Sequence, residues 1–293
     1  MTRVALIGLG EVGRTFAEDL RAVGIDLAAW DTAFPDPASA ASRNAHALDL
    51  TPAGSARDAV TGADLVVSAV TAAQCVAAAE SVALALAPGT WFFDLNSSSP
   101  GHKQSAAAAV EAAGGRYVEA ALMSPIGPRR LASPFLLGGA HASAFAAVAT
   151  QFGIADVTVV SDEVGRAAAT KLCRSVIVKG LESLLAESLL TARRFGVERD
   201  VLDSLPNILP PADWEAVAGY FISRSLQHGK RRSEEMEEAA ATVAEAGIDP
   251  WMSAATVERQ RWAAQFPEAL EAGSTIGMVD AVLRALDDEE TPA

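Results

Sequence analysis

Cysteine and histidine are scarce in this chain, which limits its covalent and metal chemistry. Its 293 residues include two cysteines, Cys75 and Cys173, and four histidines, and there is no Cys-x-x-Cys motif. Two isolated thiols argue against a disulfide framework, and the scattered histidines give no set of zinc ligands. We therefore expect a protein of the reducing cytoplasm that holds no metal.

Positive charge is also scarce, and long apolar runs are missing. Lysine and arginine number 23 against 37 aspartates and glutamates, which gives a formal charge of −14. This balance argues against binding to nucleic acid or to an anionic membrane, since both need a positive surface. The alanine-rich runs are interrupted by polar residues at helical spacing, and no charged region precedes a long apolar core at the N-terminus. We expect neither a membrane-spanning segment nor a secretory signal.

What the chain does contain is enough apolar material for two buried cores. Half of its residues are hydrophobic, and its length suits two domains. Through about residue 160, short β-branched or aromatic runs alternate with alanine-rich helical segments, a pattern typical of a mostly parallel sheet. The predicted strands are Arg3–Ile7, Asp26–Trp30, Leu65–Val70, Trp91–Leu95, Tyr117–Ala120, Phe135–Leu137 and Val157–Val160.

The second part of the chain is predicted to be all-helical. One long helix runs from Glu163 to Phe195, with Ser161 or Asp162 as its N-cap and Gly196 at its end. The other predicted helices are Ala212–Ala246, Pro250–Gln265 and Thr275–Asp287.

A glycine-rich turn follows the first predicted strand. Gly8 permits a tight turn, Gly10 lets the backbone approach a pyrophosphate, and Gly13 lets the next helix pack close to the sheet. Asp31 ends the second strand, where a carboxylate can bind ribose hydroxyls and repels a 2′-phosphate, so we expect NAD rather than NADP. Alternatively, Asp31 caps the turn before Thr32.

This pattern predicts a dinucleotide-binding Rossmann domain over residues 1–162. The long helix would join it to an all-α domain of residues 163–293. Because ligands bind at the carboxyl ends of parallel strands, the ends of the third and fourth strands belong to the predicted site. The expected cofactor-binding residues are Gly8, Leu9, Gly10, Glu11, Val12, Gly13, Asp31, Val70, Thr71 and Asn96.

Three further segments are motif-like. The first is Asp94-Leu95-Asn96-Ser97-Ser98-Ser99-Pro100, the second is Glu119-Ala120-Ala121-Leu122-Met123-Ser124-Pro125, and the third places Lys171 six residues after Gly165 and four before Ser175. They resemble the Asp-x-Ser-Thr-x-x-Pro, Asp-Ala-Pro-Val-Ser-Gly-Gly and Gly-Lys-Asn motifs of the β-hydroxyacid dehydrogenases, the family of 3-hydroxyisobutyrate and 6-phosphogluconate dehydrogenases. Asn96 stands where that family has Ser, and Ser175 stands where it has Asn. The C-terminal part is similar to a divergent 6-phosphogluconate-dehydrogenase-like subfamily.

The resemblance implies roles for these residues and a homodimer formed through the helical domain. Oxidation of an alcohol needs a group that takes the hydroxyl proton, and Lys171 is the expected general acid/base. Ser175, one helical turn later, would orient the substrate oxygen or the ammonium group. Asn96, Ser97, Ser98 and Ser124 are expected to bind the substrate. The alternatives are a solvated lysine at position 171 and simple loop capping before Pro100.

A basic run stands out in the acidic second half. His228, Arg231 and Arg232 lie close together in sequence and can form a cationic clamp for a substrate anion. Alternatively, the run pairs with neighbouring glutamates on a solvated helix face.

The sequence therefore predicts an NAD-dependent dehydrogenase that interconverts a small β-hydroxy acid and its aldehyde or keto acid. The alternatives are an oxidative decarboxylase of the 6-phosphogluconate dehydrogenase type, an imine reductase, and an NAD-binding protein without activity. Imine reductases usually carry Asp or Tyr at the position of Lys171, which counts against that alternative. Ser175 in place of Asn motivates the non-catalytic one.

Overall fold

The computed structural model describes residues 2–207 and 213–289. The chain divides into two compact units, Met1–Leu172 and Cys173–Ala293. The division falls inside the long helix, ten residues after the predicted boundary at 162/163.

A seven-stranded sheet forms the centre of the first unit, in the order β2-β1-β3-β4-β5-β6-β7. Every neighbouring pair is parallel except β5 and β6, so the predicted, mostly parallel sheet is confirmed. All seven predicted strands are present, with small differences at their ends. They are β1 Arg3–Ile7, β2 Asp26–Trp30, β3 Leu65–Ser68, β4 Trp91–Asp94, β5 Arg116–Leu122, β6 Phe135–Gly138 and β7 Val157–Val159.

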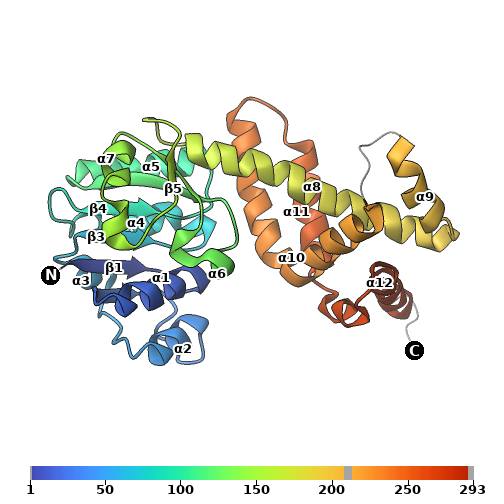
Figure 1. Ribbon diagram of the computed structural model, residues 1–293, viewed down its shortest axis with the longest axis horizontal. Helices are drawn as coiled ribbons and strands as arrows, with labels where there is room; N and C mark the ends of the chain where they lie inside the picture. The colour runs from blue at the N-terminus through green and yellow to red at the C-terminus, as the bar shows by residue number, and fades with distance from the viewer. Residues whose placement is uncertain (1, 208–212, 290–293) are drawn as a thin grey trace. The chain divides into compact units, whose positions relative to one another are not determined.

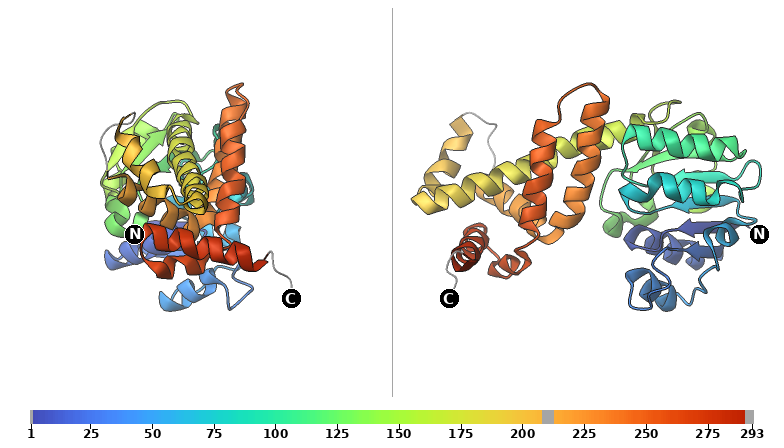
Figure 2. Two further views of the ribbon diagram at one scale, coloured as in Figure 1. Left: turned by 90° about the vertical axis from the view of Figure 1, so that its right-hand side faces the viewer. Right: turned by 180° about the vertical axis from the view of Figure 1, so that it is seen from behind.

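Helices cover both faces of this sheet (Figure 1). On one face, α1 and α7 pack Phe16 and Phe145 against Phe93 and Phe135 of the strands. On the other face, α3, α4 and α5 bury small residues against Phe92 and Tyr117, and the view from behind in Figure 2 shows α4 and α5 over the sheet. The helices of this unit are α1 Glu11–Ala22, α2 Ala40–Ala47, α3 Ala56–Val60, η1 Ala72–Gln74, α4 Cys75–Ala83, α5 Pro100–Ala112, α6 Ile126–Arg129, η2 Arg130–Ala132, α7 Ala142–Ala146 and η3 Ala149–Phe152.

The long helix α8, Arg166–Phe195, begins later than predicted. Ser161 only closes a local turn, because its Oγ accepts a hydrogen bond from the Glu163 N–H at 3.0 Å. The N-terminus of α8 is instead capped by Glu119 of β5, whose buried carboxylate accepts the N–H groups of Gly165 and Ala168 at 2.7 and 2.6 Å. The predicted N-cap at Ser161 or Asp162 is therefore wrong. The cap is supplied from 46 residues earlier in the chain, where local sequence signals do not reach.

The second unit is helical, as predicted. Its apolar core joins α8 to the later helices through Leu189, Ile222, Leu226 and Val279. Gly196 and Gly247 end α8 and α10 with φ values of +71° and +77°, which confirms both predicted helix ends. Ala212, the predicted start of α10, lies outside the described residues. The helices are α9 Glu198–Ser204, η4 Leu205–Asn207, α10 Trp214–Glu245, α11 Trp251–Ala263, η5 Pro267–Ala272 and α12 Thr275–Glu289.

None of the described helices is long and apolar enough to span a membrane.

Candidate functional site

The turn between β1 and α1 has the geometry that its glycines predict. Gly8 has a φ of +95°, and a Cβ there would lie 2.3 Å from the Ala69 carbonyl oxygen. A Cβ on Gly13 would lie 2.0 Å from the carbonyl oxygen of Gly8. Gly10, by contrast, faces open space, with no heavy atom within 4 Å of its would-be Cβ. Two glycines are thus required by packing, and Gly10 leaves the room that a pyrophosphate needs.

Asp31 lies at the end of β2 and binds the glycine-rich turn. Its Oδ2 accepts the Leu9 N–H at 2.8 Å, and its Oδ1 accepts the Ala33 N–H at 2.9 Å. The predicted turn-capping role is therefore present. Each carboxylate oxygen has two lone pairs, so this partly exposed group can still accept hydrogen bonds from a ribose.

A cavity of about 390 Å³ opens beside this turn. Its volume lies within the usual range for small-molecule sites. Five of the predicted cofactor residues line it, whereas Leu9, Glu11, Val12, Gly13 and Asn96 do not. The lining residues are Ile7, Gly8, Gly10, Trp30, Asp31, Thr32, Ala69, Val70, Thr71, Gln74, Ala77, Ala78 and Ser81.

Sequence reasoning missed the wall of this cavity that η1 and α4 supply. Gln74, Ala77 and Ser81 follow β3, which pairs with β1 and so lies next to the glycine-rich turn. The strand order β2-β1-β3 was the signal that could have placed them, but strand order is not visible in a local pattern.

The segment after β4 is held by its own polar side chains. Asn96 is buried; its Oδ1 accepts the Val70 N–H at 2.7 Å, and its Nδ2 donates to Ser68 Oγ at 2.9 Å. Ser98 is also buried and donates to the Ala72 carbonyl oxygen at 3.0 Å. Both side chains therefore fix the backbone beside the cavity, as in the loop-capping alternative.

Ser97 is only half-buried and contacts the predicted general acid/base. Lys171 Nζ, on the first turns of α8, donates to Ser97 Oγ at 2.5 Å. The structure thus brings Lys171 and Ser97 together within one unit, at the carboxyl ends of the strands.

Ser175 and Ser124 have other partners. Ser175 Oγ accepts a hydrogen bond from Lys179 Nζ at 3.0 Å, and Lys179 forms an ion pair with Glu235 at 2.9 Å. Ser124 Oγ donates to the carbonyl oxygen of Pro125. Neither side chain lines the cavity beside the glycine-rich turn.

The basic run on α10 is engaged in ion pairs. Arg231 is exposed and pairs with Glu235 one turn later, as the solvated-face alternative predicts. Arg232 is buried and pairs with Glu182 of α8, which also accepts a hydrogen bond from Gln260 at 3.1 Å. Burial raises the pKa of the Glu182 carboxyl against the opposing effect of Arg232. His228 is partly buried on the same helix. Both guanidinium groups thus have carboxylate partners, Arg231 on its own helix and Arg232 on α8, which is what the ion-pair alternative predicts.

The described residues contain no group of three or more His, Cys, Asp or Glu side chains that could hold a metal ion.

Models of known protein families match both parts of the chain. The NAD-binding domain of 6-phosphogluconate dehydrogenase matches residues 3–154, and a domain of unknown function, DUF1932, matches residues 192–263. None of the curated proteins matches.

Several solved structures are similar along nearly the whole chain. A conserved hypothetical protein from Sinorhizobium meliloti 1021 is 35% identical, with a TM-score of 0.76 and coverage of 97% of this chain and 96% of that chain. The conserved protein MTH1747 of unknown function, described as structurally similar to 3-hydroxyacid dehydrogenases, is 29% identical, with a TM-score of 0.68 and coverage of 90% and 97%. The 3-hydroxyisobutyrate dehydrogenase of Mycobacterium tuberculosis shares the fold at 19% identity, with a TM-score of 0.73 and coverage of 97% and 99%.

The domain match covers more than half of the chain and includes the glycine-rich turn and Asp31. The fold joins a Rossmann-like unit to a helical unit through α8, which agrees with the similar structures. On this match and this fold, the chain belongs to the β-hydroxyacid dehydrogenase family.

Proposed function

We propose that the protein is an NAD-preferring dehydrogenase that interconverts a small β-hydroxy acid and its aldehyde or keto acid. The observation that carries this proposal is the 2.5 Å contact between Lys171 Nζ and Ser97 Oγ. The next residue back, Asn96, binds the backbone of Val70 in the cavity wall. A proton-carrying amine is thus linked by one short segment to the cavity beside the glycine-rich turn, called the dinucleotide cavity below.

The residues around this cavity suit the parts of NAD. The first turn of α1 has no side-chain cap at Gly10, so its N–H groups are available for a pyrophosphate. Asp31 is placed to accept the ribose hydroxyls. When bound, the nicotinamide exchanges a hydride with the substrate carbon.

Lys171 moves the proton in this proposal. In the oxidation direction its neutral amine accepts the hydroxyl proton of the substrate, and in the reduction direction its ammonium donates that proton. Ser97 orients Nζ by accepting one of its N–H groups, and the Ser97 hydroxyl hydrogen stays available for the substrate oxygen.

A screen of short β-hydroxy acids for NADH formation tests the activity. Lys171→Met should then lower kcat by about 10²–10⁴-fold while leaving NADH affinity unchanged. Lys171→Arg is the matched control for charge, because it keeps a cation that cannot give up its proton, and it should be equally slow. Full activity in Lys171→Met would refute the assigned role, and NADH binding without turnover of any hydroxy acid would favour the non-catalytic alternative.

Cofactor preference is tested at Asp31. Asp31→Asn removes the negative charge and keeps an oxygen acceptor for one of the two bound backbone N–H groups. Because Asp31 is partly exposed, the variant should still fold. We expect the preference for NAD over NADP, measured as the ratio of kcat/KM values, to fall by about tenfold, or roughly 1.4 kcal/mol. A wild-type protein that already prefers NADP would contradict the assignment.

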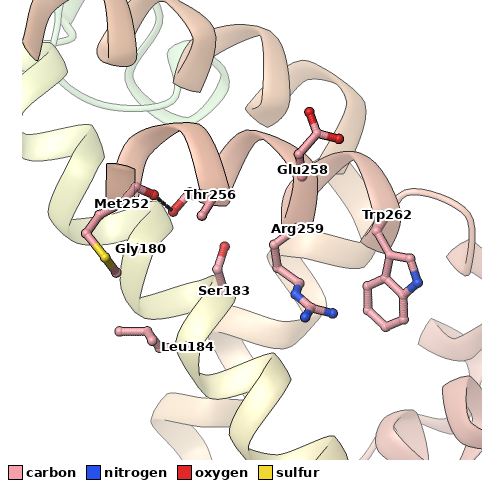
Figure 3. A pocket seen from close by; sticks show the side chains of 9 residues that line it. Gly180, Ser183, Leu184, Met252, Thr256, Glu258, Arg259 and Trp262 are labelled. Carbon is pink, nitrogen blue, oxygen red and sulfur yellow. Dashed lines mark hydrogen bonds between the residues drawn. The ribbon is translucent and has the colours of Figure 1, made fainter. Parts of the chain in front are cut away.

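We also propose a homodimer formed through the second unit. Ile177, Leu181 and Leu184 form one stripe of α8 at helical spacing, and their exposed fractions are 66%, 40% and 54%. Across a cavity of about 510 Å³, α11 presents the exposed side chain of Met252 (Figure 3). Contiguous exposed apolar surface of this kind is typical of protein interfaces.

Sedimentation tests the dimer. The wild-type chain should sediment as a dimer and Leu184→Glu as a monomer. A monomer at all concentrations of the wild type would refute this part of the proposal.

A further inference from the structure

A fully buried ion pair lies under the candidate site, and neither the family match nor the sequence analysis assigns it a role. Asp94 ends β4, and its carboxylate accepts the ammonium of Lys103 from α5 at 2.8 Å. Lys103 Nζ also donates to the Asp94 carbonyl oxygen at 3.0 Å. The exposed fractions of the Lys103 and Asp94 side chains are 1% and 0%, so water does not reach either charge.

Three more donors complete the shell of the Asp94 carboxylate. Its Oδ1 accepts the Asn96 N–H at 2.9 Å, and its Oδ2 accepts the Tyr117 hydroxyl at 2.7 Å and the Cys75 thiol at 3.2 Å. Burial and the neighbouring Asp94 charge raise the pKa of Cys75 to about 12 and that of Tyr117 well above its ordinary value. Both groups therefore keep their protons and remain donors to Asp94 at neutral pH.

Stability alone does not account for such a pair. Removing two charges from water is unfavourable for each ion, and an apolar pair of similar volume is often at least as stable. The hydrogen bonds around Asp94 instead hold its carboxylate in one position. The carboxylate in turn fixes the backbone at Asn96, which it binds.

What Asp94 holds is the segment that links the cavity to Lys171. Its Oδ1 binds the Asn96 N–H, and the Asn96 side chain binds the Val70 N–H in the cavity wall. The next residue, Ser97, accepts the hydrogen bond from Lys171. A shift of Asp94 would thus move both ends of this connection.

We propose that Lys103 is a positioning residue, which locks Asp94 and thereby sets where Ser97 holds the Lys171 amine relative to the dinucleotide cavity. Lys103 itself touches neither substrate nor cofactor. The expected loss of kcat rests on the proposed dehydrogenase function. The expected effect on the position of the Lys171 amine rests on the structure alone. A misplacement of about 1 Å in a catalytic group can cost about 10²-fold in rate.

The decisive variant is the double substitution Lys103→Met with Asp94→Asn. It removes both buried charges together, and the new side-chain amide keeps an oxygen for the Asn96 N–H while its NH₂ group can donate to the Tyr117 oxygen. The single Lys103→Met leaves an unpaired buried carboxylate and can fail to fold, so the double variant keeps the proposal testable. The matched control is Arg129→Met with Asp156→Asn, which removes an exposed ion pair of the same unit at 3.1 Å.

Two measurements distinguish positioning from a purely structural role. We expect the double variant to keep its NADH affinity and KM within about threefold, and to lose about 10- to 100-fold in kcat with a shifted pH profile. We also expect the pH dependence of amine labelling at Lys171, followed by mass spectrometry, to shift. The control variant should change neither.

The labelling experiment separates the two proposals. An unchanged labelling profile of Lys171 in the folded double variant overturns the positioning role, whether or not the protein turns over a hydroxy acid. A shifted profile in a protein without turnover supports the positioning of Lys171 and refutes only the dehydrogenase proposal. Unchanged kcat in an active double variant also overturns the positioning role.

Discussion

At the scale of single residues, substitutions at two glycines of the β1–α1 turn should have different effects, because their surroundings differ. Gly10→Ala places its methyl group in open space, so the melting temperature should stay near that of the wild type. NAD affinity should fall at least about tenfold, because the methyl group occupies room that the pyrophosphate needs. Gly13→Ala is the contrasting variant, since its Cβ would lie 2.0 Å from the Gly8 carbonyl oxygen and should destabilise the unit itself. Thermal melting and NADH titration of both variants check this, and equal loss of stability in both would contradict it.

The two cysteines make a second prediction. Cys75 is buried and its pKa is raised to about 12, whereas Cys173 is exposed. Because the thiolate is the reactive form, a disulfide reagent at pH 8 should modify Cys173 rapidly and leave Cys75 unmodified. Both thiols should react after denaturation. Rapid loss of both thiols in the native protein would show that the buried cluster around Asp94 opens.

The sequence predicted those residues of the site whose roles follow from the local backbone. Gly8, Gly10 and Asp31 are of this kind, because a strand–turn–helix pattern fixes their geometry. Lys171 was carried over from the family resemblance, and its contact with Ser97 joins residues 74 positions apart. The buried pair of Asp94 and Lys103 was missed. The sequence places Lys103 in an alanine-rich helix. It does not show that the lysine side chain points inward and reaches the end of β4.

At the scale of secondary structure, periodicity predicted the elements, and tertiary contacts set some of their ends. The start of α8 depends on Glu119, which the sequence presents only as part of a motif that begins in the fifth strand. The same contact explains why the two units divide inside α8, since Glu119 ties the first turn of that helix to the sheet.

This cap yields a third prediction. In Glu119→Gln, one of the two N–H groups at the start of α8 faces an amide NH₂ group instead of an oxygen. We expect the free energy of unfolding to fall by about 1–3 kcal/mol, the cost of leaving a buried donor unsatisfied. Glu111→Gln, an exposed substitution on α5, is the matched control and should be neutral. If both variants had the same urea midpoint, the Glu119 cap would not stabilise the protein and the prediction would be wrong.

The ion pair between α8 and α10 makes a fourth prediction. Arg232→Met leaves the Glu182 carboxylate buried without its cation, and should cost about 3–5 kcal/mol of stability. Adding Glu182→Leu removes both charges and should recover most of that loss. Urea unfolding of the two variants measures the difference. If Arg232 bound the substrate anion instead, the double variant would raise KM sharply without this recovery in stability.

At the scale of the whole molecule, the composition argued against a disulfide framework, a zinc site and nucleic-acid binding. It could not predict where the chain divides into two units. Each unit has its own apolar core, one built around the sheet and one among the helices. The dinucleotide cavity is lined only by residues of the first unit, so a bound cofactor stabilises that unit directly. At a ligand concentration 100 times Kd, this linkage is worth about 2.7 kcal/mol.

The last prediction follows from that linkage and concerns thermal unfolding. We expect two calorimetric transitions, of which NADH raises only that of the first unit, by about 5–10 °C for a unit of this size. Arg232→Met assigns the other transition, because its ion pair lies within the second unit and should lower only that melting temperature. A single transition that moves as a whole, both with NADH and in Arg232→Met, would mean that the shared helix α8 makes the two units unfold as one.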